Sequence, residues 1–199
     1  MRPSTHRSRP RVIGLALAIA LMLGTVVGLA GCTKATGSKG STSGAASAET
    51  TPGQFPADKP NPAQTPPPPM LSRPKTAVYS YLLWISYAYR ILNSDVATMA
   101  FSPYEEVRVN SYVELNRQQG RAIDQRLLNF QVKSVESKGN TATVGVREQW
   151  AYRYIDIKTA KYNSAILNAT YDTTYTVVKG RSGWLVDSVK AQAVGGAVK

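Results

Sequence analysis

Thiols and imidazoles are almost absent from this chain of 199 residues, which has one cysteine, Cys32, and one histidine, His6. Because both lie near the N-terminus, the rest of the sequence has no cysteine pair for a disulfide and no thiolate or imidazole for a zinc site. Catalysis by a Ser–His or Cys–His pair is excluded there for the same reason. The following domain must be stabilised by core burial alone, and the sequence predicts neither a metal nor a cofactor.

The N-terminal segment has the order of parts found in a secretory signal. A short stretch whose only charged side chains are arginines precedes an uncharged, mostly apolar run from Val12 to Ala30, and Gly31 and Cys32 follow. The tetrapeptide Leu29-Ala30-Gly31-Cys32 resembles the bacterial lipobox, in which the peptide before the cysteine is removed and the thiol is alkylated by lipid. We therefore expect a signal peptide over residues 1–31, cleavage between Gly31 and Cys32, and a lipid on Cys32.

This interpretation predicts a membrane-anchored protein on the extracytoplasmic face of a bacterial cell membrane. The alternative is that residues 12–30 form an uncleaved transmembrane helix, since the run is long enough to span a bilayer. That alternative leaves the cysteine at its boundary unexplained. In both cases the basic end stays in the cytoplasm and the remainder lies outside.

Acidic side chains are scarce, with 12 Asp and Glu against 24 Lys and Arg. The excess of positive charge suits anionic lipid headgroups or wall polymers, and a generic solvated basic surface would have the same composition. Nucleic acid is not an expected partner for an exported protein.

A segment rich in Gly, Ser, Thr and Ala and then in Pro follows the cysteine and extends to about Pro74. Because it has few apolar side chains, we expect a disordered tether over residues 32–74, flexible at first and stiffer where prolines accumulate. The alternative is that the run from Pro66 to Pro69 binds an aromatic-lined groove on a partner. The expected domain covers residues 75–193, and residues 194–199 form a flexible tail.

Two helices are expected at the start of this domain. Apolar residues recur at steps of three and four from Thr76 to Met99, which predicts a long amphipathic helix. Its other faces also carry aromatic residues, so the helix is either covered within the domain or shared with a second subunit as a homodimer. Ser102 and Glu105, with Pro103 between them, predict a capping box that starts a second helix, which ends at Gly120.

After Gly120 the apolar pattern changes to a period of two, which predicts antiparallel strands. Gly145 is a candidate site for a bend in the second of them. The fold class is therefore α+β, with a long N-terminal helix and a short helix packed on a curved, cone-like sheet of about four strands. The strands are expected through Leu128, Phe130 and Val132, from Ala142 to Tyr154, from Leu167 to Val177, and from Trp184 to Ala191.

The stretch from Tyr171 to Val178, a short turn, and Gly183-Trp184-Leu185-Val186-Asp187-Ser188-Val189 resemble the closing hairpin of the nuclear-transport-factor-2-like (cystatin-like) superfamily. The stretch is similar in particular to the domain family first named from plastid division proteins. The resemblance extends over about Thr76 to Ala191. It implies a cone-shaped sheet with a concave pocket, and it implies no activity, because members include enzymes, binding modules and interaction domains.

In enzymatic members of this superfamily a carboxylate in the cone acts as a general base. Glu148 is the candidate here, because alternation along its strand directs it to the same face as Val144, Val146 and Trp150. Burial among aromatics would raise its pKa towards neutrality. The alternatives are a bulge in the strand, or a rim position at which Glu148 pairs with Arg153. The expected pocket residues are Glu148, Trp150, Tyr152, Tyr171 and Tyr175, and the tyrosines could equally be core.

The function predicted from the sequence is that of a membrane-anchored lipoprotein whose domain is a non-catalytic binding or interaction module of the cell envelope. An envelope protein, an anionic polymer or an apolar ligand is the expected partner. One alternative is a histidine-free isomerase- or lyase-like enzyme with Glu148 as base. Another is a structural module that dimerises through its first helix.

Overall fold

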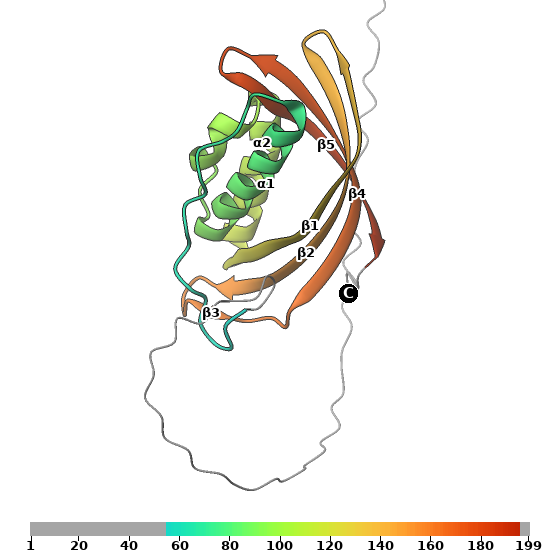
Figure 1. Cartoon of the computed structure of the whole chain (residues 1–199). Helices are drawn as coiled ribbons and strands as arrows, with labels where there is room; N and C mark the ends of the chain where they lie inside the picture. The colour runs from blue at the N-terminus through green and yellow to red at the C-terminus, as the bar shows by residue number, and fades with distance from the viewer. Residues whose placement is uncertain (1–54, 196–199) are drawn as a thin grey trace, which may run out of the picture. The chain divides into compact units, whose positions relative to one another are not determined.

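The computed structural model describes residues 55–195, which form two α-helices, a 3₁₀-helix and an antiparallel sheet. The sheet has the order β1-β2-β4-β5, with β3 paired to β2. Figure 1 shows the long strands curving around α1 and α2, which lie on one side of the sheet. The expected α+β fold class is confirmed. The elements are α1 (Pro74–Ile91), η1 (Asp95–Ala100), α2 (Pro103–Gln118), β1 (Arg121–Lys138), β2 (Thr141–Asp156), β3 (Lys161–Tyr162), β4 (Leu167–Gly180) and β5 (Gly183–Gly195).

The signal peptide, its cleavage site and Cys32 lie outside the described residues. The expected flexible tail of residues 194–199 is wrong at its start, because β5 continues past Ala191 to Gly195, which pairs with Thr170. Within residues 55–195, no helix has the length and apolar content needed to cross a membrane. The same residues contain no group of three or more His, Cys, Asp or Glu side chains placed to hold a metal ion.

The core lies between α1 and the concave face of the sheet. Helix α1 buries Val78, Tyr81 and Ile85 on the side that faces the strands. Each fully buried side chain of this kind contributes about 1.5–3 kcal/mol relative to an exposed one. From the sheet and α2, the core receives Val109, Val113, Val144, Val146, Val177 and Val186, all at most 2% exposed.

Helix α1 ends at Ile91, so the expectation of one helix to Met99 is wrong. Leu92 adopts the left-handed conformation with φ 56°, and its N–H still donates to Ala88 O. The Asn93 side chain then accepts a hydrogen bond from Asp95 N at 3.0 Å, and the chain continues as η1. Short polar side chains compete with the helix in this way by bonding the nearby backbone.

The start of α2 is as expected, but its capping box is not formed. Ser102 is the N-cap, and its hydroxyl accepts a hydrogen bond from Glu105 N. The Ser102 N–H, which a capping box would pair with the Glu105 carboxylate, donates instead to Val186 O at 2.8 Å. Glu105 is thereby left to turn into the core, where it is 1% exposed.

Strand β1 is longer than expected and contains two irregularities in its pairing with β2. The first lies between Leu127 and Asn129, so the intervening Leu128 is 41% exposed, contrary to its expected place on the apolar face. The second lies between Val132 and Ser134, opposite Gly145, the expected bend site. A Cβ on Gly145 would lie 2.7 Å from Ser134 Oγ, so a side chain there would disturb this close approach.

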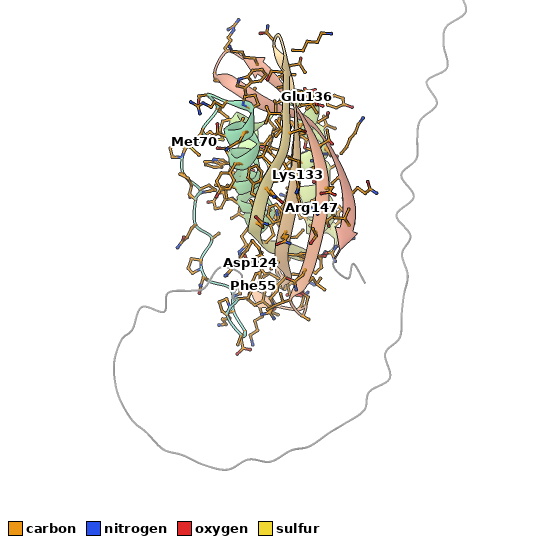
Figure 2. All side chains as sticks on the ribbon, turned by 45° about the vertical axis from the view of Figure 1, so that its right-hand side comes forward. Phe55, Met70, Asp124, Lys133, Glu136 and Arg147 are labelled. Carbon is orange, nitrogen blue, oxygen red and sulfur yellow. The ribbon has the colours of Figure 1, made fainter. Side chains whose placement is uncertain are left out.

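Residues 55–73, here named the strap, differ from the expected tether because they pack against the domain. Phe55 is 9% exposed, with the Arg126 guanidinium 4.3 Å from its ring centre. Figure 2 shows Phe55 and Met70 at opposite ends of this segment. The strap has few apolar side chains, which is why its composition predicted a disordered tether. It is held mainly through its backbone instead. Hydrogen bonds to its carbonyl oxygens come from Arg153 (Pro56 and Ala57), Tyr162 N (Asp58), Arg90 (Asn61), Trp84 Nε1 (Pro67) and Trp184 N (Leu71).

Replacing Gly183 with alanine should destabilise the domain by roughly 1–3 kcal/mol. Gly183 has φ 129°, and an added Cβ would lie 2.5 Å from Leu71 O and 2.6 Å from its Cβ. The clash would push the strap away from the β4–β5 turn. Urea unfolding measures the change, and Gly195→Ala is the control, because its nearest atom would be 3.8 Å away. Equal stability of the two variants would contradict this account of the strap's attachment.

Candidate functional site

The expected pocket residues separate into two groups. Trp150, Tyr152 and Tyr171 line a small cavity of about 140 Å³, together with side chains from α2 and β1. Ligand pockets typically have about 300–1,000 Å³, so this cavity is too small for a drug-sized ligand. Glu148 and Tyr175 do not line it. The remaining lining residues are Tyr112, Ile123, Gln125 and Tyr154.

Glu148 points into the core, where both of its carboxylate oxygens accept hydrogen bonds. It is 3% exposed; Tyr175 donates its hydroxyl to Oε1, and Trp150 Nε1 donates to Oε2 at 2.8 Å. The rim position that would pair it with Arg153 is not observed, because Arg153 donates to the carbonyls of Ser164 and Pro56. The carboxylate therefore joins two strands of the core.

Burial raises the pKa of Glu148 above its ordinary value, although hydrogen bonds from Tyr175 and Trp150 oppose the shift. Burial also raises the pKa of Tyr175 well above its ordinary value, and the neighbouring Glu148 charge adds to the effect. In the small cavity, burial raises the pKa of Tyr152 to about 12, so its hydroxyl stays protonated at neutral pH. The Tyr152 hydroxyl can therefore act as a hydrogen-bond donor in the cavity.

Glu148→Gln should alter the pH dependence of stability. Because the folded-state pKa of Glu148 is raised, the native state holds its proton more tightly than the unfolded state, and stability falls as pH rises above about 4.5. A glutamine does not titrate, and its amide can accept from Trp150 while donating to the Tyr175 oxygen. Relative to wild type, the variant should therefore gain stability as pH rises, as measured by urea unfolding between pH 4 and pH 8.

The control for this pH series is Glu136→Gln, at an exposed position beside the β1–β2 turn, which Figure 2 labels. Its stability difference from wild type should not change in this way. A Glu148→Gln difference that stays constant with pH would contradict the raised pKa. The lowered pKa of Asp172, caused mainly by its hydrogen bonds with Arg147, acts below about pH 3.8 and lies outside this window.

The outward face of α2 carries three exposed apolar side chains among polar ones such as Ser111 and Gln118. Tyr104 and Val107 are 74% and 69% exposed, and Leu115 is 40% exposed on the same face. The inward face meanwhile buries Glu105 and Asn116, each 1% exposed. Neighbouring exposed apolar side chains of this kind are a candidate interaction surface. We name Tyr104, Val107 and Leu115 the α2 stripe.

A cleft of about 490 Å³ lies beside the N-terminal half of this stripe, between α2 and β5. Tyr104 and Val107 form its α2 wall, and Val189 and Lys190 form its β5 wall. Lining atoms from Glu105 and Arg108 complete it, and their opposite charges are paired with each other. The cleft therefore offers apolar surface with one further positive charge, from Lys190.

Sequence reasoning passed over the α2 stripe. A signal was present, because apolar residues of the helix from Pro103 to Gln118 are spread over more than one face, and one buried face cannot use them all. The inward turn of Glu105 leaves the stripe on the outside.

The outer face of the sheet carries a basic groove of about 580 Å³. Such a groove is where an anionic partner, expected from the excess of positive charge, could bind. Lys133, Arg147 and Lys190 line the groove, and Figure 2 shows Lys133 and Arg147 there. Arg147 is paired with Asp172, at 2.6 Å between Nη2 and Oδ2, so its charge is largely compensated. Both side chains are about two-fifths exposed, and such pairs contribute little to stability.

The domain thus belongs to the class of proteins in which a curved antiparallel sheet wraps around a helical layer. No family model and no curated protein matches the chain. Solved structures are similar in fold. The intermembrane-space region of the chloroplast protein ARC6 aligns over 61% of this chain and 98% of its own, with 18% identity and a TM-score of 0.49.

Two further solved structures align with lower TM-scores. An NTF-2-like protein of unknown function from Shewanella oneidensis aligns over 60% of this chain and 98% of its own, with 12% identity and a TM-score of 0.39. A domain from Nostoc punctiforme with a cystatin-like fold aligns over 60% of this chain and 76% of its own, with 13% identity and a TM-score of 0.37. At these identities the likeness concerns the fold alone.

Proposed function

We propose that the chain is an extracytoplasmic lipoprotein, anchored through Cys32, whose domain is a non-catalytic module that binds another protein of the cell envelope. The observation that carries the binding role is the α2 stripe, with Tyr104 and Val107 largely exposed beside an apolar cleft. The anchor is supported by the signal-like segment and the lipobox ending in Cys32.

The chemistry of the cleft favours an apolar protein segment as its occupant. An aromatic side chain such as Tyr104 can contribute much of the binding energy when a partner excludes water from it, and Val107 adds apolar area beside it. Lys190 at the β5 wall would favour a partner with a carboxylate beside its apolar residues.

The enzymatic alternative, with Glu148 as general base, has less support. A base must reach the proton that it abstracts, and Glu148 does not line the small cavity of the cone. Its two oxygens already accept hydrogen bonds from Tyr175 and Trp150. If Glu148→Gln abolished the chemical conversion of a ligand while the fold stayed intact, the enzymatic alternative would replace our proposal.

The homodimer predicted through the first helix is a separate proposal. In this chain α1 is covered by the sheet and by the strap, and its large exposed apolar side chains are Tyr79 and Ile91, at 36% and 38% exposure. Analytical ultracentrifugation of the unlipidated chain tests it. A mass of one chain would exclude the homodimer and leave the binding role unchanged.

The binding role predicts that a Tyr104→Ser, Val107→Ser double variant loses its partner. The tagged chain is purified in mild detergent from its own host, and co-purifying envelope proteins are quantified by mass spectrometry. We expect at least a tenfold loss of one partner, since losing two apolar anchors costs more than about 1.4 kcal/mol. Val135→Ser is the control, because Val135 is 45% exposed but lies away from the cleft. Equal recovery with both variants would contradict the assignment of the surface.

A further inference from the structure

The strap lies in a groove of its own domain, and its proline-rich part packs there with a regular spacing of half-buried residues. Prolines favour the polyproline II helix, which has three residues per turn and leaves its carbonyls free. Pro66 and Pro69 are half-buried, whereas Pro67 and Pro68 between them are exposed. This spacing of three places one edge of the run against the domain.

The groove supplies the donors and rings that such a segment needs. Trp84 Nε1 donates to Pro67 O at 3.1 Å, and the Tyr87 hydroxyl accepts from Thr65 Oγ1 at 3.4 Å. The Trp84 and Tyr87 rings meet edge to face, 6.2 Å between centres. Arg90 on the next turn of α1 donates to Asn61 O at 2.9 Å. Indole N–H donors and aromatic walls are how proteins bind polyproline segments in general.

Both ends of the strap are also fixed to the domain. Phe55 is buried at one end, and Leu71 O accepts from Trp184 N at 2.8 Å at the other. Between them, a cleft of about 500 Å³ remains between residues 61–67 and the surface of α1 and β1. The middle of the strap is therefore the part that another segment could replace.

We propose that the α1 groove around Trp84 and Tyr87 is a binding site for a proline-rich segment of another envelope protein, and that the strap occupies this site as an intramolecular competitor. The site is distinct from the α2 stripe, so it stands if the stripe binds nothing. Because the strap is covalently attached, its effective concentration at the groove is high, on the order of millimolar. A partner segment must bind tightly enough to displace the strap at this effective concentration. The site is therefore selective for longer or better-fitting proline-rich segments.

The test uses the full chain with Cys32→Ser, which keeps it unlipidated, and a fluorescent peptide with the sequence of residues 60–71. In an opened variant, Pro66→Ser and Pro69→Ser weaken the strap and leave the groove unchanged. Fluorescence anisotropy should show the peptide binding this variant at least about tenfold more tightly than the chain with the native strap. The matched control is Pro67→Ser with Pro68→Ser, which alters exposed prolines. Its affinity for the peptide should remain close to that of the chain with the native strap.

Adding Trp84→Phe to the opened variant removes the indole N–H and should weaken peptide binding about tenfold. Equal binding with and without this change would overturn the proposal, as would equal binding to the opened variant and to the native strap. A sedimentation mass of two chains that returns to one when peptide is added would assign the groove to a second copy, and would overturn the assignment to another protein.

A second measurement needs no strap variant and applies if the opened variant does not fold. The chain has three tryptophans, so its ¹⁵N spectrum contains three indole signals, and Trp84→Phe identifies the one from Trp84. Millimolar peptide added to the chain with the native strap should shift this signal and leave that of Trp150, which does not contact the strap, in place. No shift of the Trp84 signal would overturn the proposal.

Discussion

Replacement of Cys32 by serine is expected to move the protein from the membrane fraction to the aqueous fraction. Serine has no thiol to accept a lipid, and the proposed anchor would depend on acyl chains that contribute about 0.8 kcal/mol for each buried methylene. Partition between detergent and aqueous phases in Triton X-114 measures the change, and intact mass shows the loss of lipid. We expect nearly complete transfer.

The control for this experiment is Thr33→Ser, next to the attachment site, which should remain lipidated and membrane-bound. A wild-type chain whose intact mass shows residues 1–31 retained and no lipid on Cys32 would contradict the lipoprotein proposal. That result would instead favour residues 12–30 as an uncleaved transmembrane helix.

Replacement of Glu105 by alanine is expected to cost about 2–4 kcal/mol of folding stability. Its carboxylate accepts from the Tyr81 hydroxyl at 2.5 Å and from Arg108 Nε at 2.9 Å. Arg108 is half exposed and can be hydrated after the change, but Tyr81 is 1% exposed and would lose its acceptor. Chemical denaturation gives the free energy of unfolding.

Glu106→Ala provides a matched control, because Glu106 is exposed one residue further along the same helical turn. It should change stability by less than about 0.5 kcal/mol. Similar losses for the two variants would mean that Glu105 acts as a surface residue near the helix N-terminus and not as a core acceptor. The loss of stability in Glu105→Gln should lie between those of Glu105→Ala and Glu106→Ala, since the amide oxygen can still accept a hydrogen bond from Tyr81.

The strands were largely predictable from the sequence because a half-buried strand alternates apolar and polar residues over a few positions. Alternation from Val144 to Trp150 directs every second side chain to one face, and the structure places Glu148 on that face. The turn at Gly139, where φ is 60°, follows from the same kind of local rule. These features depend on neighbouring residues, so a single sequence contains them.

The features that sequence reasoning missed depend on partners far along the chain. The strap contains few apolar side chains, and its packing depends on donors such as Trp84, Arg153 and Trp184, which no local pattern reveals. Glu105 fits a capping box locally, but Val186 O takes the N–H that it would have bonded. Tertiary contacts override local preference at both places.

The candidate site was predictable only in part. Trp150, Tyr152 and Tyr171 line one small cavity, and its volume depends on how the side chains pack, which alternation along a strand does not reveal. The hydrogen bonds that engage both oxygens of Glu148 come from its own strand and from β4, so the carboxylate's environment required the strand register. The exposure of Tyr104 and Val107 required knowledge of which face of α2 is inward.

The measurement that tests the binding role most directly is site-specific photocrosslinking in living cells. A photoreactive amino acid at position 104, on the α2 stripe, should give one discrete crosslink to an envelope protein. The same amino acid at position 135, also exposed but distant from the cleft, should give none. No crosslink from position 104, or the same products from both positions, would contradict the proposal that this face of the domain binds a protein partner.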